Sequence, residues 1–363
     1  MISSSSSENN FFKARFGLSY LSTEVEKIFK CSVYEVFCQA IEGDASDRSY
    51  FRVSFKSEAD QKNPHSLIVM QLKDPVSDSE TDFTRTLKFL REIDLPAPEL
   101  FHHDVAMGLL FLEDCGIRTL REQLNVFPES RAQLYRQAVE LLFDMQTRAT
   151  RMINSECPAY HVRFDAEKLM WEFNFMLDHY VGGLCGSPLE SFAKKEVREV
   201  FSPLCELLAA QKLYFTHRDY HSRNLMVDGK RLVLIDFQDA RMGPCQYDLV
   251  SLLKDSYMQI DDSLLEELID LYIRLKEKEE GREVDREEFC RIFDGASLQR
   301  NLKAVGTFAY QSVEKKNNRY ICYIAPTLGY VRQTLGRGYR NSALREALFK
   351  YIPGLDGKEV VEL

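Results

Sequence analysis

Long apolar stretches and a secretion signal are both missing from this sequence. The longest apolar runs, such as LIVM and GLLFL, are far shorter than the roughly 20 residues that a transmembrane helix needs. The first residues, MISSSSSENN, are polar and contain no basic segment followed by an apolar one, so we expect no signal peptide. We therefore expect a cytoplasmic protein that has no membrane partner.

A basic surface and paired cysteines are lacking as well. The formal net charge is −9 and the sequence contains no basic stripe. Because phosphate backbones select basic faces, this charge argues against nucleic acid as the main partner. The nine cysteines include no CxxC pair and predict neither a zinc site nor a disulfide framework. Several lie in apolar runs, as buried free thiols do in a reducing compartment.

The first third of the chain has the pattern of a small sheet. The chain has 363 residues, 45% of them hydrophobic, which is enough for two lobes. Residues 1–10 read as a disordered tail, and a capping box at Thr23 and Glu26 predicts a short helix over 23–30. Strand patterns follow between 33 and 72 and again at 108–114, with helical spacing over 79–93.

After residue 115 the pattern becomes helical. Helical stripes cover 129–149, 165–181, 187–211 and most of 246–351, and an Asp-Gly turn at 228–229 predicts a hairpin between two short strands. We expect an α+β fold with a small antiparallel β-sheet in an N-lobe over 1–114. A larger, mostly helical C-lobe is expected over 115–363.

One polar segment, FTHRDYHSRN at 215–224, lies between apolar segments. It contains His217, Arg218, Asp219 and Asn224 in the spacing H-R-D-x-x-x-x-N, and Asp236 follows twelve residues later at a predicted strand end. A polar turn between strands would also use Asp and Asn. The complete spacing favours instead the catalytic loop and metal-binding aspartate that kinases use for phosphoryl transfer.

This chemistry assigns a role to each residue type. Asp219 is expected to accept a hydrogen bond from the substrate hydroxyl, and His217 to support the loop by hydrogen bonding. Mg²⁺ prefers oxygen ligands and keeps some waters, so the Asp236 carboxylate and the Asn224 amide oxygen suit it. We place Arg218 with the catalytic residues of the same loop. The predicted cofactors are ATP and Mg²⁺.

The nucleotide site is expected from the N-terminal half. The segment GDASDRSYFRV puts Gly43, Ala45 and Ser46 in a turn between strands, where backbone N–H groups can face phosphate oxygens. Alone, this segment is better explained as a plain hairpin turn, and it is the downstream motif that favours the phosphate contact. In LFLEDCG, backbone groups from Glu113 to Cys115 are expected at a hinge between the lobes, where they would hydrogen-bond adenine.

Together these segments resemble the aminoglycoside-phosphotransferase and choline-kinase-like superfamily. IDFQDARMGPCQYDLVSLL has Asp-Phe-Gln where protein kinases have Asp-Phe-Gly, and no A-P-E segment follows. GDASDRSYFRV, LPAPEL, GLLFLEDCG and LQRNLKAVGTFAY (298–310) are more closely similar to bacterial anomeric kinases of N-acetylmuramate and N-acetylglucosamine. This resemblance, over roughly residues 43–310, implies a bilobal protein-kinase-like fold. It also implies a sugar 1-phosphate product made during cell-wall sugar recycling.

The sequence departs from the kinase pattern at the strand lysine that normally contacts the α- and β-phosphates. In LIVMQLKDP the first position to align is Met70, and Lys73 lies three residues further on. Lys73, Arg48 or Arg52 are the alternatives for this contact, and a site without it is also possible.

Candidate acceptor ligands lie in two helical regions and just after the metal-binding strand. They are Trp171, Glu172, Arg241, Arg300 and Asn301. Three of them have a plainer interpretation, Trp171 as a core residue and Arg300 and Asn301 as helix surface. An aminoglycoside, choline or another small alcohol remains an alternative acceptor, since the acidic balance suits a cation. A non-catalytic kinase-fold module is a third alternative. We expect a monomer or weak dimer.

Overall fold

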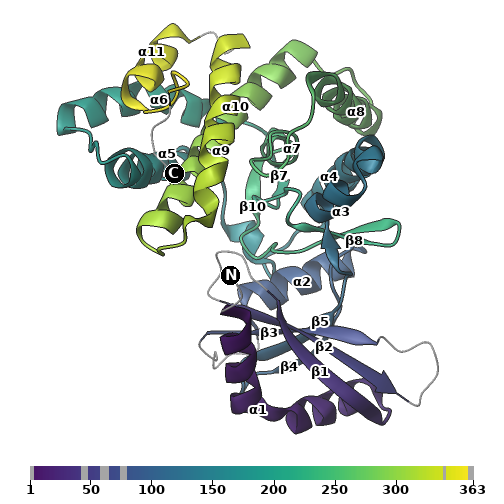
Figure 1. Cartoon of the computed structure of the whole chain (residues 1–363). Helices are drawn as coiled ribbons and strands as arrows, with labels where there is room; N and C mark the ends of the chain where they lie inside the picture. Colours follow the sequence, from purple (N-terminus) through teal and green to yellow (C-terminus); the bar gives the residue numbers. More distant parts are fainter. Residues whose placement is uncertain (1–3, 42–47, 58–64, 74–79, 338–340, 359–363) are drawn as a thin grey trace.

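The computed structural model describes residues 4–41, 48–57, 65–73, 80–337 and 341–358. The first part of the chain forms an antiparallel sheet of five strands in the order β1-β2-β3-β5-β4 (Figure 1). The strands are β1 (Val33–Ile41), β2 (Ser49–Ser57), β3 (Ser66–Gln71), β4 (Leu100–Asp104) and β5 (Leu109–Glu113). This confirms the predicted small antiparallel sheet. Strand β4 was not predicted, since its sequence LFHHD lacks a clear alternation of apolar and polar residues.

Alternate side chains of the sheet pack into two different hydrophobic cores. In β5, Leu109 and Phe111 pack with Leu21 and Val25 of the first helix, α1 (Ser4–Phe29). The intervening Leu110 and Leu112 belong to the larger core, which also contains α2 (Asp82–Glu92) and the helical part of the chain. Because side chains alternate across a strand, α1 covers one face and α2 lies between the other face and the rest of the molecule (Figure 1).

The predicted short helix over 23–30 is part of a longer one. α1 begins at Ser4, inside the segment predicted to be a tail, and is kinked at Gly17, whose φ of 73° lies in the left-handed region. Thr23 is in the helix interior, where its hydroxyl donates to the Ser19 carbonyl. The predicted capping box at Thr23 is therefore wrong, because a side chain bonded to the preceding turn cannot cap a helix start.

The remainder of the chain is mostly helical, as predicted. Its helices are α3 (Leu120–Val126), α4 (Arg131–Met152), α5 (Ala166–Met176), α6 (Ser191–Ala209), α7 (Gln246–Leu253), α8 (Asp262–Glu280), α9 (Arg286–Val313), α10 (Ile324–Arg337) and α11 (Ser342–Tyr351). Short helical turns occur at Pro128–Ser130 (η1), Pro158–His161 (η2), Leu177–Leu184 (η3) and Asn318–Tyr323 (η4). Within the described ranges, no helix is both long and apolar enough to cross a membrane. All nine cysteines are free.

Two small sheets interrupt these helices. β7 (Leu213–Thr216) pairs with β10 (Arg241–Pro244), and β8 (Leu225–Asp228) lies between β6 (Arg118–Thr119) and β9 (Arg231–Leu234). The β8–β9 hairpin is the predicted one. The α+β architecture is confirmed, and the division of the chain at residue 114 stays a prediction.

Polar contacts join the five-stranded sheet to the helical part at the segment that follows β5. Arg52 of β2 forms an ion pair with Asp114, at 2.7 Å, and donates to the Gly116 carbonyl. Ser66 of β3 donates to the same carboxylate, at 2.7 Å. Glu113 pairs with Arg231 of β9, at 2.6 Å. Charged contacts of this kind orient the two parts of the molecule toward each other.

Helix α9 approaches α5 so closely that only a glycine fits at their contact. A Cβ atom built on Gly306 would lie 2.7 Å from the Met176 Cα and 3.0 Å from its backbone nitrogen. Backbone atoms cannot yield as a flexible side chain does, so a larger residue must push the helices apart. Gly306 therefore fixes the position of α9 in the fold.

We predict that Gly306→Ala lowers the free energy of unfolding by about 1–3 kcal/mol, because the added methyl overpacks this contact. Gly329→Ala in α10 is the matched control. Its Cβ would meet no atom within 4 Å, so the change should stabilise by roughly 0.5–1 kcal/mol through helix propensity. Denaturant unfolding of both variants measures the difference. Equal stability of the two variants would mean that the close helix contact is absent.

Candidate active site

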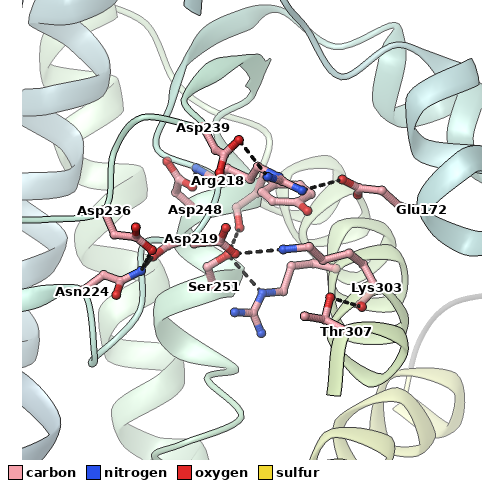
Figure 2. Close-up of polar contacts among 12 residues, drawn as sticks. Glu172, Arg218, Asp219, Asn224, Asp236, Asp239, Asp248, Ser251, Lys303 and Thr307 are labelled. Carbon is pink, nitrogen blue, oxygen red and sulfur yellow. Dashed lines mark hydrogen bonds and ion pairs between the residues drawn. The ribbon is translucent and has the colours of Figure 1, made fainter. Parts of the chain in front are cut away.

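Residues 217–224 form a loop between two apolar strands. β7 ends at Thr216 and β8 begins at Leu225. β7 is paired with β10, and β8 with β6 and β9. The loop brings Asp219 and Asn224 together with Asp236, which follows β9 (Figure 2). The Asn224 amide nitrogen donates to the Asp219 carbonyl at 3.0 Å and lies 3.4 Å from the Asp236 carboxylate. Three residues singled out from sequence spacing therefore meet in one place.

Asp248 of α7 fixes the start of this loop. Its carboxylate accepts the backbone N–H groups of His217, at 2.6 Å, and of Arg218, at 2.9 Å. Arg218 has a φ of 79°, in the left-handed region that non-glycine residues rarely adopt. Burial raises the pKa of Asp248 to about 7, although the two backbone donors act in the opposite direction. The buried carboxylate thus holds a strained backbone in place.

His217 is buried and hydrogen-bonded to the segment that carries Asp236. Its Nε2 atom lies 3.0 Å from the Ile235 carbonyl, and burial lowers the pKa of the ring. This contact joins the loop to the residue before Asp236. It agrees with a supporting role for the histidine, as the sequence interpretation proposed.

Lys303 of α9 forms an ion pair with Asp219, and the sequence interpretation did not single it out. Its Nζ atom lies 2.9 Å from Oδ1 of the carboxylate (Figure 2). Burial alone raises the pKa of Asp219, but the charges of Lys303 and Arg218 outweigh it and hold the pKa well below its ordinary value. Asp219 is therefore ionised, with one oxygen held by Lys303. The quoted segment LQRNLKAVGTFAY contains this lysine, and its helical position three residues after Arg300 was the available signal.

Arg218 extends away from the loop and lies between two carboxylates. Its guanidinium is 3.4 Å from Glu172 and 3.5 Å from Asp239 (Figure 2). Glu172 is only 1% exposed and is also held by Gln299, at 3.0 Å, and by Lys168, at 3.6 Å. In this arrangement Glu172, predicted as an acceptor ligand, is a partner of the catalytic loop.

The pair of Asp236 and Asn224 suits a divalent cation. Burial raises the pKa of Asp236, and the neighbouring charge of Asp219 adds to this effect, so the carboxylate lies where a cation would be stabilised. The bond from Asn224 to the Asp219 carbonyl orients its amide and leaves the amide oxygen as a ligand. Mg²⁺ keeps several waters and needs only one or two carboxylates, which matches this sparse donor set.

Comparison with known proteins now decides the family. Residues 38–285 match the phosphotransferase enzyme family. The chain belongs to this family. It is 29% identical over 320 residues to an N-acetylmuramate/N-acetylglucosamine kinase of Neisseria meningitidis serogroup B, covering 86% of this chain and 89% of that protein. The phosphotransferase is therefore a kinase whose acceptor is a hydroxyl group.

Two solved structures share the fold of this phosphotransferase. An ethanolamine kinase of Plasmodium vivax is 12% identical, covers 82% of each chain and has a TM-score of 0.57. An aminoglycoside phosphotransferase, APH(4)-Ia, in a ternary complex with ADP and hygromycin B, is 14% identical with a TM-score of 0.52. That match covers 88% of this chain and 99% of the other. These similarities confirm the predicted bilobal, protein-kinase-like fold.

The structure distinguishes the alternatives for the missing strand lysine of the phosphotransferase. Met70 is 1% exposed and belongs to the core that contains α2. Arg52 is bound to Asp114, and Lys73 is exposed, two residues after the end of β3. Arg48 lies over the Phe83 ring at 5.5 Å, and its charge acts to lower the pKa of Asp236. Of these basic candidates, Arg48 is thus the one with an identified effect on Asp236 in the described part of the chain.

The remaining residues predicted to bind the nucleotide come from two segments of the sequence. Gly43, Ala45 and Ser46 are outside the described residues. Glu113 is the last residue of β5, where its side chain is paired with Arg231, and Cys115 lies in the connection that follows. Cys115 is buried, and burial raises the pKa of its thiol to about 12. Any contact of Cys115 with adenine is therefore expected through its backbone, as the sequence interpretation proposed.

The predicted acceptor ligands are scattered over several elements. Trp171 is 53% exposed on α5, with the Lys168 ammonium 3.9 Å from the centre of its ring. Arg241 lies over the Phe164 ring at 5.1 Å. Arg300 and Asn301 of α9 are buried, bonded to Ser251 and Ser297 respectively, both at 3.2 Å. The structure does not gather all five residues: the charge of Glu172 acts on Arg241, whereas Arg300 and Asn301 contact serines of α7 and α9. Their role in binding the acceptor stays a prediction.

We predict that Lys303→Met lowers kcat by about 10- to 100-fold, since a charge-assisted hydrogen bond in a buried site contributes about 1.5–3 kcal/mol. The affinity for nucleotide should change less than about twofold, because Lys303 contacts Asp219 and not the Asn224–Asp236 pair. Lys303→Arg retains the charge and should recover part of the rate. Steady-state kinetics and nucleotide titration test both points. A wild-type kcat for the methionine variant would contradict the role of this contact.

Proposed function

We propose that this phosphotransferase is an ATP- and Mg²⁺-dependent kinase of an amino sugar. The acceptor is N-acetylmuramate or N-acetylglucosamine, and the reacting group is the anomeric hydroxyl, so that the product is a sugar 1-phosphate. The convergence of Asp219, Asn224 and Asp236 carries the proposal for the reaction. The name of the relatives, which match this chain over most of its length, supports the acceptor.

Asp219 orients the acceptor in this proposal. Lys303 occupies Oδ1 of its carboxylate, so Oδ2 accepts the hydrogen bond from the sugar hydroxyl. With its pKa held low, Asp219 acts by aligning the hydroxyl, and it receives the proton only as the oxygen–phosphorus bond forms. His217 and Asp248 keep the loop that carries Asp219 in position.

Asn224 and Asp236 would hold Mg²⁺, which offsets the charge of the nucleotide phosphates when bound. Arg48 supplies a second positive charge on this side of the site, in place of the strand lysine. Backbone groups of the Glu113–Cys115 segment bind adenine in the proposed site. The nucleotide then lies between the five-stranded sheet and the loop 217–224.

The surroundings of Asp219 favour a neutral or acidic acceptor over a cationic one. Lys303 lies 2.9 Å from the carboxylate that would meet the acceptor hydroxyl. Like charges repel at short distance in a partly buried site, so an ammonium group beside this hydroxyl is disfavoured. The negative net charge of the whole chain suits choline or an aminoglycoside, but the local charge does not.

We predict that N-acetylmuramate and N-acetylglucosamine accept phosphate from labelled ATP in the presence of Mg²⁺. Choline, ethanolamine and an aminoglycoside should accept at least about 100-fold less in kcat/KM, because a missing or repelled polar contact in a buried site costs several kcal/mol. Blocking the anomeric position as a methyl glycoside should abolish transfer. The assay measures labelled product for each acceptor of the panel.

Three outcomes would contradict the proposal. Transfer to choline or an aminoglycoside alone would leave the phosphotransferase activity intact and refute the sugar acceptor. Transfer to the methyl glycosides would keep the sugar and refute the anomeric hydroxyl as the reacting group. Absence of transfer to any acceptor, with intact nucleotide binding, would support the non-catalytic alternative.

A further inference from the structure

Arg121 lies beside the catalytic loop, in the first turn of α3. Its backbone N–H donates to the Ser222 carbonyl at 3.0 Å, which ties it to the loop three residues after Asp219. Its guanidinium lies over the rings of Tyr257, at 5.8 Å, and Tyr323, at 5.5 Å, and donates to the Tyr323 hydroxyl at 2.9 Å. No role in the proposed reaction has yet been assigned to this residue.

A second arginine converges on the same rings. The guanidinium of Arg223, in the catalytic loop, lies 4.7 Å from the centre of the Tyr257 ring. Tyr257 in turn packs edge-on against Tyr323, with centroids 4.7 Å apart, and against His221, at 5.1 Å. Two cations, two partly buried tyrosines and the catalytic loop thus form one cluster. Stacking on a ring leaves the N–H edges of a guanidinium directed outward, where they can bind a planar anion.

Both arginines of the cluster carry a positive charge, although the net charge of the whole chain is −9. Arg121 forms no ion pair with any carboxylate of the described residues, and its guanidinium contacts two ring faces and one hydroxyl. The buried Asp255 carboxylate accepts the backbone N–H of Tyr257 and the hydroxyl of Ser222. Burial and the charges of Arg300, Arg223 and Lys303 hold the pKa of His221 well below its ordinary value, which shows that several cations act on this part of the site. Asp219 is the acidic group that acts on His221 in the opposite sense.

We propose that Arg121 and Arg223, set on the rings of Tyr257 and Tyr323, bind a carboxylate group of the acceptor while its reacting hydroxyl lies at Asp219. This inference rests on the proposed amino-sugar acceptor, and it adds that N-acetylmuramate is preferred over N-acetylglucosamine. N-acetylmuramate carries a carboxylate on an ether substituent that N-acetylglucosamine lacks. The tyrosine rings supply apolar faces of the kind that sugar rings contact. The cluster therefore selects the acidic amino sugar.

Charge and geometry support a carboxylate more than a hydroxyl as the bound group. A guanidinium presents paired donors that match the two oxygens of a carboxylate. The nucleotide phosphates are a second possible source of anionic oxygens near the loop. In the proposed arrangement they lie with Asn224, Asp236 and Arg48, so nucleotide affinity distinguishes the two sources.

The test is calorimetric binding of N-acetylmuramate, N-acetylglucosamine and Mg–ATP to the wild type, Arg121→Gln and Arg223→Gln. We expect each variant to lose about 10- to 100-fold in affinity for N-acetylmuramate relative to N-acetylglucosamine, as removal of a charge-assisted hydrogen bond does. Arg118→Gln is the matched control. Its guanidinium lies over Phe127, at 5.6 Å, and the ratio of the two affinities should not change.

Each other outcome overturns the proposal in a distinct way. An unchanged ratio in both variants, with the wild type binding both sugars, refutes the carboxylate site and leaves the proposed function standing. A loss of Mg–ATP affinity with an unchanged sugar ratio assigns the arginines to the nucleotide. A wild type that binds neither sugar refutes the amino-sugar acceptor and the carboxylate site together. Thermal unfolding of each variant checks that the fold is retained.

Discussion

The buried carboxylate of Asp248 is the contact on which the active site depends. It accepts two successive backbone N–H groups, from His217 and Arg218, and so fixes the entry of the loop 217–224. Arg218 can keep its left-handed backbone only because surrounding contacts determine it, and such strained residues are common at functional sites. The positions of the later loop residues depend on this entry, because Asp219 follows directly and contacts Lys303, and Asn224 contacts Asp236.

The rest of the fold brings distant segments to this loop. Helix α9 delivers Lys303, and its close approach to α5 at Gly306 limits where that lysine can lie. Arg52 binds Asp114 and the Gly116 carbonyl, and so ties the five-stranded sheet to the segment that leads into the helical part of the chain. Arg48 directly precedes β2 of this sheet. The site is thus a balance of charges: acidic groups face the proposed cation and the acceptor hydroxyl, and basic groups from other elements surround them. Burial makes each of these charges act more strongly than it would at the surface.

Local motifs were predictable from the sequence, and contacts between distant segments were not. The spacing of His217, Asp219, Asn224 and Asp236 identified the loop, because one turn and one hairpin bring these residues together. The five-stranded sheet was mostly predicted by its alternating pattern, except for β4. By contrast, Lys303 lies 84 residues from Asp219, and Tyr323 lies 202 residues from Arg121. The periodicity of apolar residues in the sequence does not predict such pairs, since they result from how helices pack. For the same reason the contact between Glu172 and Arg218 could not be foreseen.

The central claim is that Asp219 orients the acceptor hydroxyl, whereas Asp236 binds the cation that accompanies the nucleotide. The most direct test compares Mg–ATP affinity and turnover in Asp219→Ala and Asp236→Ala. The account predicts that Asp219→Ala loses about 10³-fold or more in kcat while its Mg–ATP affinity stays within about twofold of the wild type. Asp236→Ala should lose at least about tenfold in Mg–ATP affinity, as removal of a carboxylate ligand does. Wild-type turnover in the first variant, or wild-type Mg–ATP affinity in the second, would contradict it.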